Sequence, residues 1–236
     1  MEIEPLGDSA LIVRVVNNFE HGPDAALNAV LRVFHSLEAA AIPGVIELAP
    51  AYSTVAVFYD PARISRTELS PSPFDCLTAK IEGALQNQSR GAGEGASSRA
   101  LEIPVCYDPE FAFDLGHVAV HGGLSEAEVV RRHAGARYRV NCVGFTPGFP
   151  YLTGLPTELA TPRRATPRTE IPAGSVAIGG AQTGIYPSKS PGGWNVIGRT
   201  PLRLFDVKHE PPAMFQAGDR ITLRQISREE FDSLRQ

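Results

Sequence analysis

The stretch from Tyr138 to Arg199 constrains the fold more than any other part of this chain. Its apolar runs are short, as in Ser175-Val-Ala-Ile and Asn195-Val-Ile-Gly, and glycine or proline interrupts them. Glycine allows positive φ or a close backbone approach, and proline fixes φ, so a loop that holds both can be rigid. No helix of ordinary length fits this pattern, which predicts many short strands joined by ordered loops.

Three long motifs lie within this stretch. They are Phe145-Thr-Pro-Gly-Phe-Pro-Tyr-Leu, Ala177-Ile-Gly-Gly-Ala-Gln-Thr-Gly-Ile-Tyr-Pro and Ser190-Pro-Gly-Gly-Trp. In order and spacing they resemble the family of 5-oxoprolinase B subunits, also called KipI-like or allophanate hydrolase subunit 1-like. Weaker similarity at Gly7-Asp8-Ser9-Ala10 and Tyr59-Asp60-Pro61 extends the resemblance over nearly the whole chain.

Composition excludes several classes of protein. With 236 residues, 43% hydrophobic and 20% charged, the chain is typical of a soluble globular protein of one or two domains. A net charge of -4 argues against a nucleic-acid surface, which must neutralise phosphates. No apolar run approaches the roughly 20 residues that span a bilayer, and the acidic start Met1-Glu-Ile-Glu is not a signal peptide. We therefore expect neither a nucleic-acid nor a membrane partner.

The cysteines indicate the compartment. Cys76, Cys106 and Cys142 are far apart and odd in number, without a zinc or redox spacing. We interpret them as small buried apolar residues in a reduced, cytoplasmic setting.

Residues 1–90 are predicted to form an α+β sandwich domain, with one sheet and both helices on one face. The order is hairpin, helix, hairpin, helix. The expected elements are a hairpin of Ile3–Leu6 and Ala10–Val16, a helix from Pro23 to about Ala40, a hairpin of Val45–Leu48 and Thr54–Tyr59 around Ala49–Pro50, and a helix with Phe74, Leu77, Ile81 and Leu85 at helical spacing. Residues 91–99 read by composition as a flexible linker.

Residues 100–236 are predicted to be mainly β. The expected elements are a strand at Leu101–Tyr107, a short helix at Asp114–His121, a helix after the Ser125/Glu128 capping box to about His133, and strands that include Arg203-Leu-Phe-Asp-Val and Asp219-Arg-Ile-Thr-Leu-Arg. Many short strands with Gly and Pro turns predict a closed or nearly closed β-barrel. The family resemblance implies a cyclophilin-like barrel, although fold alone does not imply isomerase activity.

Histidines and arginines supply the polar candidates for a site. The resemblance places a histidine at His133, whose alternative role is a charge partner for the helix C-terminus. His117 and His121 are expected to be exposed rather than metal ligands, and we expect no metal. Guanidinium groups suit carboxylate or phosphate ligands. Three lie between Pro162 and Glu170 with no carboxylate in that segment, so the loop is either an anion site or a solvated basic loop: Arg163, Arg164 and Arg168.

The glycine-rich motifs supply further candidates. Gln182, Thr183 and Tyr186 could converge on a polar ligand, or could form turns and bury a hydroxyl. Four aromatic residues could wall a ligand site or simply pack in the core, which we expect above all for Phe145. The four are Phe145, Phe149, Tyr151 and Trp194, of which Trp194 is the strongest functional candidate.

No complete catalytic set is visible, so the catalytic residues are unknown. The family resemblance implies one subunit of an ATP-dependent 5-oxoprolinase, which opens the lactam of 5-oxo-L-proline to L-glutamate. ATP would phosphorylate the carbonyl oxygen before water attacks, and the partners would be the A subunit of 5-oxoprolinase and its carboxyltransferase-like C subunit. Two alternatives stay open, a KipI-type inhibitor of a sensor histidine kinase and part of a urea carboxylase-type biotin-dependent carboxyltransferase.

Overall fold

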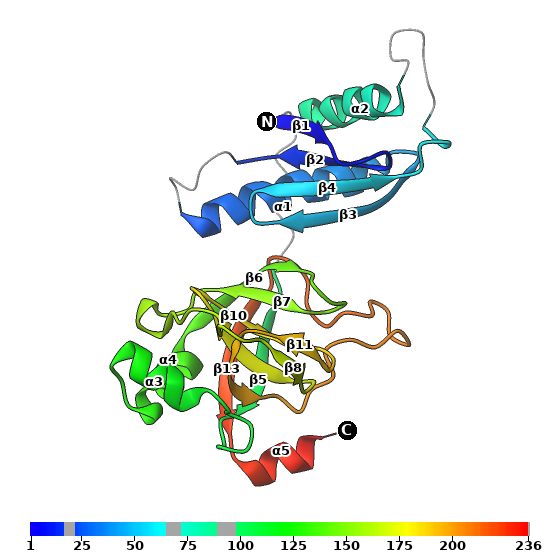
Figure 1. The fold of residues 1–236 in the computed structure, drawn as a ribbon. Helices are drawn as coiled ribbons and strands as arrows, with labels where there is room; N and C mark the ends of the chain where they lie inside the picture. The colour runs from blue at the N-terminus through cyan, green and yellow to red at the C-terminus, as the bar shows by residue number, and fades with distance from the viewer. Residues whose placement is uncertain (17–21, 65–71, 89–97, 236) are drawn as a thin grey trace. The chain divides into compact units, whose positions relative to one another are not determined.

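The computed structural model describes residues 1–16, 22–64, 72–88 and 98–235 (Figure 1). The chain divides into two compact units, Met1–Ser97 and Ser98–Gln236. The linker expected at 91–99 lies almost wholly outside the described residues. No helix in the described ranges is both long enough and apolar enough to cross a membrane.

The N-terminal unit is one antiparallel sheet with two helices. The strands stand in the order β1-β2-β4-β3. The elements are β1 (Glu2–Pro5), β2 (Ala10–Arg14), α1 (Pro23–Ala40), β3 (Val45–Ala51), β4 (Thr54–Tyr59) and α2 (Pro73–Gln88). Alternate residues of β2 and β4, such as Leu11 and Val57, point to one face and are buried with Val30 of α1 and Leu77 of α2. Each such side chain contributes about 1.5–3 kcal/mol when it leaves water, so this shared core ties both helices to the sheet.

The second hairpin turns later than the sequence predicts. Ala51 pairs with Thr54, so the turn is Tyr52–Ser53, and Tyr52 has a φ of 46°. The predicted turn at Ala49–Pro50 is wrong because Pro50 lies inside β3, paired with Val55. Proline lacks the N–H of a ladder bond, and an edge strand such as β3 tolerates that loss.

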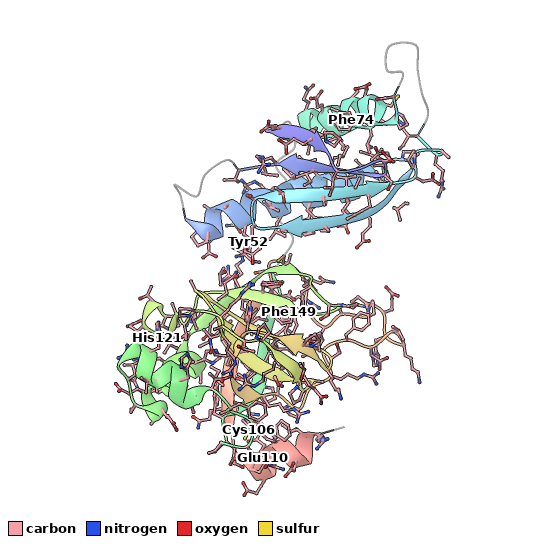
Figure 2. All side chains as sticks on the ribbon, viewed as in Figure 1. Tyr52, Phe74, Cys106, Glu110, His121 and Phe149 are labelled. Atoms are coloured by element: carbon pink, nitrogen blue, oxygen red, sulfur yellow. The ribbon has the colours of Figure 1, made fainter. Side chains whose placement is uncertain are left out.

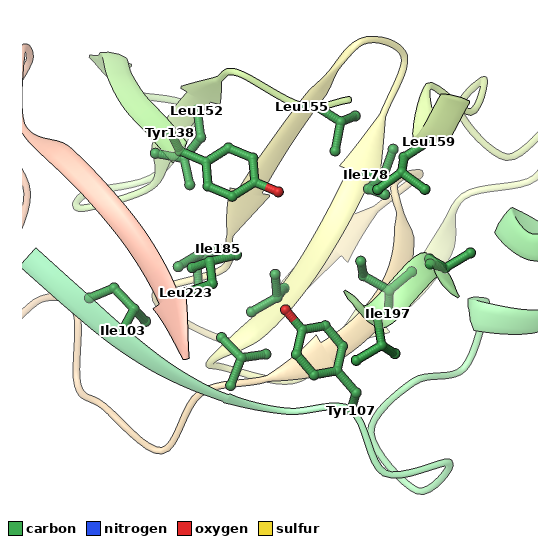
Figure 3. Close-up of a cluster of buried hydrophobic side chains, with 14 of the residues drawn as sticks. Ile103, Tyr107, Tyr138, Leu152, Leu155, Leu159, Ile178, Ile185, Ile197 and Leu223 are labelled. Carbon is green, nitrogen blue, oxygen red and sulfur yellow. The ribbon is translucent and has the colours of Figure 1, made fainter. Parts of the chain in front are cut away.

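The C-terminal unit is a closed seven-stranded barrel, as the sequence predicts. The strands follow the order β10-β7-β6-β13-β5-β12-β9, and only β5 with β13 is a parallel pair. Their bounds are β5 (Ala100–Cys106), β6 (Arg137–Val143), β7 (Pro150–Thr153), β9 (Ser175–Gly179), β10 (Gln182–Ile185), β12 (Asn195–Arg199) and β13 (Arg220–Ile226). Alternating side chains such as Ile103, Leu152, Ile185 and Leu223 fill the interior (Figure 3).

Shorter elements surround the barrel. They are α3 (Leu115–Gly122), α4 (Glu126–Gly135), the 3-10 turn η1 (Thr157–Leu159), α5 (Arg228–Leu234), and the paired strands β8 (Arg168–Ile171) and β11 (Ser190–Gly192). The capping box predicted for α4 is present, because the Ser125 hydroxyl accepts the Glu128 N–H and the Glu128 carboxylate accepts the Ser125 N–H. All three cysteines are buried, as expected, and none of them is in a disulfide bond.

The strand predicted from Arg203 to Val207 is wrong. Only an isolated bridge between Phe205 and Ala213 occurs there, and Val207 is 78% exposed. The cause is local, because the Asp206 carboxylate accepts the Lys208 N–H at 3.0 Å and thereby turns the backbone.

Candidate functional site

Aromatic rings from three separate motifs meet on one side of the barrel. Phe149 precedes β7, Tyr186 follows β10 and Trp194 precedes β12, and all three are buried. The Phe149 ring centroid lies 5.1 Å from that of Tyr186 and 5.6 Å from that of Trp194, in edge-to-face geometry. Tyr151, half-buried on β7, lies 5.8 Å from Trp194. These four rings are called the aromatic cluster below. Phe149, which Figure 2 labels, contacts the other three.

Three glycines of the motifs make room for this cluster. A Cβ at Gly179 would lie 2.6 Å from Trp194 Nε1, and one at Gly184 would lie 2.8 Å from Phe149 Cζ. A Cβ at Gly192 would collide with the Tyr186 hydroxyl. The glycines are therefore required by the close approach of backbone to aromatic ring.

Phe145 departs from its expected role. Its side chain is 63% exposed, so the prediction of ordinary core packing is wrong. The residue has a φ of 68° in a tight loop, where Thr146 N–H donates to Gly144 O and Phe149 N–H donates to Thr146 O. A non-glycine residue in this conformation stores about 1 kcal/mol or more of strain. The ring centroids of Phe145 and Phe149 lie 5.7 Å apart in edge-to-face geometry, so Phe145 extends the aromatic cluster to the surface.

Two of the three candidate arginines bind a buried carboxylate. Asp114 is 3% exposed, and its two oxygens accept from Arg164 Nη1 at 2.7 Å and from Arg168 Nη1 and Nη2 at 2.7 and 2.9 Å. The same carboxylate accepts the Val196 N–H at 2.8 Å. The solvated-loop alternative is therefore wrong for Arg164 and Arg168, since a carboxylate more than forty positions earlier reaches both. Glu170 pairs instead with Lys189 at 2.7 Å.

Arg163 differs from its two neighbours. Its side chain is exposed and, within the described part of the chain, makes no ion pair. Its guanidinium carbon lies 5.9 Å from the centroid of the Trp194 ring, within cation–π range. Arg163, the edge of Trp194 and the half-buried Tyr151 therefore lie together as one group of a cation and two aromatic rings, called the arginine–aromatic surface below.

His133 lies on α4, and its fully buried side chain contacts residues of the barrel. Its Nδ1 is 2.8 Å from the Tyr107 hydroxyl, and its Nε2 is 3.0 Å from Thr183 Oγ1. Thr183 donates its own proton to Ala177 O at 3.0 Å, so the imidazole donates from Nε2 and accepts at Nδ1. The Tyr138 hydroxyl donates to His133 O at 2.7 Å, and Figure 3 shows the Tyr107 and Tyr138 hydroxyls pointing into the interior.

Burial sets the protonation of these groups. Loss of water lowers the pKa of His133 to about 3 and raises the pKa of Tyr107 and Tyr138, so all three side chains are neutral at neutral pH. An uncharged imidazole cannot be the charge partner of the helix end, so that alternative role for His133 is wrong.

Stability should therefore depend on pH through His133. In the unfolded chain His133 binds a proton below about pH 6.5, whereas in the folded protein it binds one only below about pH 3. The free energy of unfolding therefore falls as the pH falls from about 6.5 to about 3. Between about pH 7.5 and about pH 5.5 its contribution to the loss in free energy of unfolding is about 1.4 kcal/mol. Urea unfolding at the two pH values measures the loss in free energy of unfolding. This loss should include the His133 contribution in the wild type and in His121→Gln, and the contribution should be absent in His133→Gln. Equal losses in wild type and His133→Gln would contradict the burial argument.

The structure thus separates the predicted site residues into groups. Phe149, Tyr151, Arg163, Tyr186 and Trp194 lie together. Arg164 and Arg168 lie at Asp114, His133 and Thr183 lie in the interior, and Gln182 lies opposite Gly179 where β9 turns into β10.

Sequence reasoning missed Asp114 and Tyr107 and misjudged Phe145. Asp114 had one local signal, its place before α3, which is typical of a helix cap. Its carboxylate makes no cap bond there because the arginines and Val196 occupy it.

The described ranges contain no candidate metal site. No group of three or more His, Cys, Asp and Glu residues there could hold an ion. His117 and His121, four apart on α3, are both exposed, and His121 lies well away from Phe149 (Figure 2).

Comparison with known proteins identifies the family of this chain. Residues 1–215 match the model of the carboxyltransferase domain, subdomain C and D. The whole chain is 38% identical over 237 residues to the 5-oxoprolinase B subunit of Bacillus subtilis (strain 168), covering 97% of that protein. The chain belongs to the family of 5-oxoprolinase B subunits. A second member, the 5-oxoprolinase B subunit of Escherichia coli O157:H7, is 53% identical over 124 residues, which are 52% of this chain and 57% of that protein.

Longer proteins contain a similar region. The crystal structure of TTHA0988 matches this member of the 5-oxoprolinase family with a TM-score of 0.74 and 34% identity. The match covers 92% of this chain and 40% of that longer chain. A putative urea carboxylase of Emericella nidulans is 28% identical over 205 residues, which are 75% of this chain and 16% of that protein. The chain therefore spans only part of the length of these two proteins.

Proposed function

We propose that this chain is the B subunit of an ATP-dependent 5-oxoprolinase that hydrolyses 5-oxo-L-proline to L-glutamate. It would act in the cytoplasm with the A subunit of 5-oxoprolinase and the carboxyltransferase-like C subunit, and would be inactive alone. The observation that carries the proposal is the 38% identity over the whole chain to a protein named as the B subunit of 5-oxoprolinase. An expected likeness of the barrel to cyclophilin belongs to the same proposal and brings no isomerase activity with it.

The chemistry explains why a complex would be needed. A lactam is a poor electrophile, so ATP would phosphorylate its carbonyl oxygen and release ADP. Water would then attack the carbon, the ring C–N bond would break to leave an acyl phosphate and the free amine, and a second water would hydrolyse the acyl phosphate to L-glutamate and phosphate. The arginine–aromatic surface could bind and orient an organic anion, because Arg163 supplies an exposed guanidinium beside Trp194. His133 is sealed in the interior and offers no proton to an outside ligand. The ATP-dependent steps are assigned to the assembled complex.

Reconstitution tests the proposal. The purified chain, its two companion subunits and all three together are each incubated with 5-oxo-L-proline and ATP, and L-glutamate and ADP are measured. We expect both products only from the three-subunit mixture, and neither product without 5-oxo-L-proline. Turnover by this chain alone would refute the shared site, and an inactive complete mixture would refute the function.

The match to a putative urea carboxylase supports a second candidate, part of a biotin-dependent carboxyltransferase. It predicts that the chain co-purifies with a biotin carboxylase and supports ATP- and bicarbonate-dependent carboxylation of urea. The same preparation, supplied with urea and bicarbonate in place of 5-oxo-L-proline, distinguishes the two. Consumption of urea without release of glutamate would favour the carboxylase.

A further inference from the structure

We infer that Arg163 and Trp194 form a subsite for a small organic carboxylate, and that Asp114 is the residue that positions them. The identity of the ligand, 5-oxo-L-proline, rests on the proposed function. The contacts that define the subsite are independent of it.

Of the three arginines of this segment, Arg163 is the one that remains available to bind an anion. Asp114 takes up Arg164 and Arg168 through three hydrogen bonds of 2.7 to 2.9 Å. Two guanidinium groups share one carboxylate, so this buried network keeps an excess positive charge. Arg163 adds a further charge and has no ion-pair partner among the residues described. An anion near Arg163 therefore meets a favourable field and an unoccupied guanidinium.

The backbone on both sides of Arg163 is fixed. Thr161 and Gly180 exchange both of their backbone hydrogen bonds, and Pro162 O accepts from Asn195 Nδ2 at 2.9 Å. Arg164 N–H donates to Gly193 O at 2.8 Å. Arg163 thus sits between two anchors that tie its loop to the residues on either side of Trp194. Little backbone entropy remains to be lost when its side chain grips a ligand.

Asp114 joins the two halves of the subsite. Its side chain holds Arg164 and Arg168 on the arginine segment, and its carboxylate accepts the Val196 N–H two residues after Trp194. Its own N–H donates to Val196 O at 2.8 Å. One buried residue therefore sets the distance between the arginine segment and the Trp194 strand, without itself contacting the ligand.

The ligand class follows from the groups that remain exposed. A guanidinium binds a carboxylate through two parallel N–H···O bonds, which lysine cannot reproduce. Tyr151, half-buried with its ring centroid 5.8 Å from that of Trp194, offers aromatic surface for a small ring on the same side. A carboxylate on a small, flat ring fits both features, and 5-oxo-L-proline is such a molecule.

Trp194 supplies the assay, because it is the only tryptophan of the chain. The full-length chain is titrated with 5-oxo-L-proline, with 2-pyrrolidinone, which has the same ring without the carboxylate, and with acetate, while Trp194 fluorescence is recorded. We expect a saturable change with 5-oxo-L-proline, a Kd at least about tenfold weaker for 2-pyrrolidinone, and weak competition by acetate. Arg163→Ala and Arg163→Lys should each raise the Kd by about tenfold or more. Arg131→Ala, at an exposed arginine of α4, should leave it unchanged.

The positioning role of Asp114 has its own readout. Folded Asp114→Asn, checked by circular dichroism, should bind 5-oxo-L-proline at least about fivefold more weakly although Arg163 is intact. If Asp114→Asn does not fold, Arg168→Lys replaces it, since lysine keeps the charge and loses the bidentate contact. A wild-type Kd in the folded variant would overturn the positioning role.

The outcomes separate the subsite from the proposed function. No saturable Trp194 response to 5-oxo-L-proline or acetate would overturn the subsite, even if the three-subunit mixture releases glutamate. An Arg163-dependent response in a chain whose complete mixture is inactive would support the subsite and refute the function. A response that Arg163→Ala leaves unchanged would place the carboxylate elsewhere and overturn the subsite.

Discussion

Asp114→Asn should lower the free energy of unfolding of the barrel unit by about 3 kcal/mol. Removing one partner of a buried ion pair costs about 3–5 kcal/mol, and the lower value applies because Arg164 and Arg168 keep part of their surface in water. The amide would also place an N–H₂ group where the carboxylate now accepts from two arginines and a backbone N–H. Urea unfolding followed by Trp194 fluorescence measures the loss.

Asp232→Asn is the matched control for this experiment. Asp232 also pairs with an arginine, Arg228, at 2.9 Å, but its side chain is 51% exposed. An exposed pair at this helical spacing contributes little to stability, because water screens both charges. If Asp114→Asn cost no more than Asp232→Asn, the buried network would not hold the arginine segment in place.

Gly179→Ala should destabilise the same unit by about 2–3 kcal/mol and move the Trp194 emission. A methyl group at this position would lie 2.5 Å from Cδ2 and 2.6 Å from Nε1 of the Trp194 ring, which is itself buried. Adding a methyl group to a packed region typically costs about 1–3 kcal/mol, and here a rigid indole must move. The displaced ring should also weaken any ligand response that Trp194 reports.

Gly193→Ala isolates this effect from the general cost of replacing glycine in the motif. A Cβ at Gly193 would meet its nearest neighbour, Pro167 Cγ, at 3.7 Å, which is ordinary contact. We expect a change in stability within about 0.5 kcal/mol and an unmoved emission maximum. Equal losses for Gly179→Ala and Gly193→Ala would mean that ring clearance is not why glycine stands at 179.

Local patterns sufficed to predict much of the barrel. The runs at Ser175 and Asn195 became β9 and β12, and the Ser125 capping box begins α4. Each of these signals acts over a few residues, through alternation or a single hydrogen bond. The strand predicted at Arg203–Val207 was also decided by a local signal. The alternating pattern of this run favours a strand, but the turn at Asp206 interrupts it.

The site was harder to predict because its decisive contacts are long-range. Nothing near Arg168 in the sequence signals that its partner, Asp114, stands 54 positions earlier. The exposure of Phe145 likewise depends on a loop conformation with positive φ, which aromatic residues rarely adopt. Phe149, Tyr186 and Trp194 could be named as site candidates from their motifs, but only the closed barrel brings their rings together.

The parallel pairing of β5 with β13 has a consequence for the order of events during folding. These are the first and last strands of the barrel unit, and Ala100 lies beside Arg220. In the barrel, β13 lies between β5 and β6. During synthesis, more than seventy further residues must leave the ribosome after β6 before β13 is available to pair with them. Pairings so distant in sequence slow folding. The nascent unit therefore carries two open strand edges, the kind of surface that chaperones shield, until its last strand arrives.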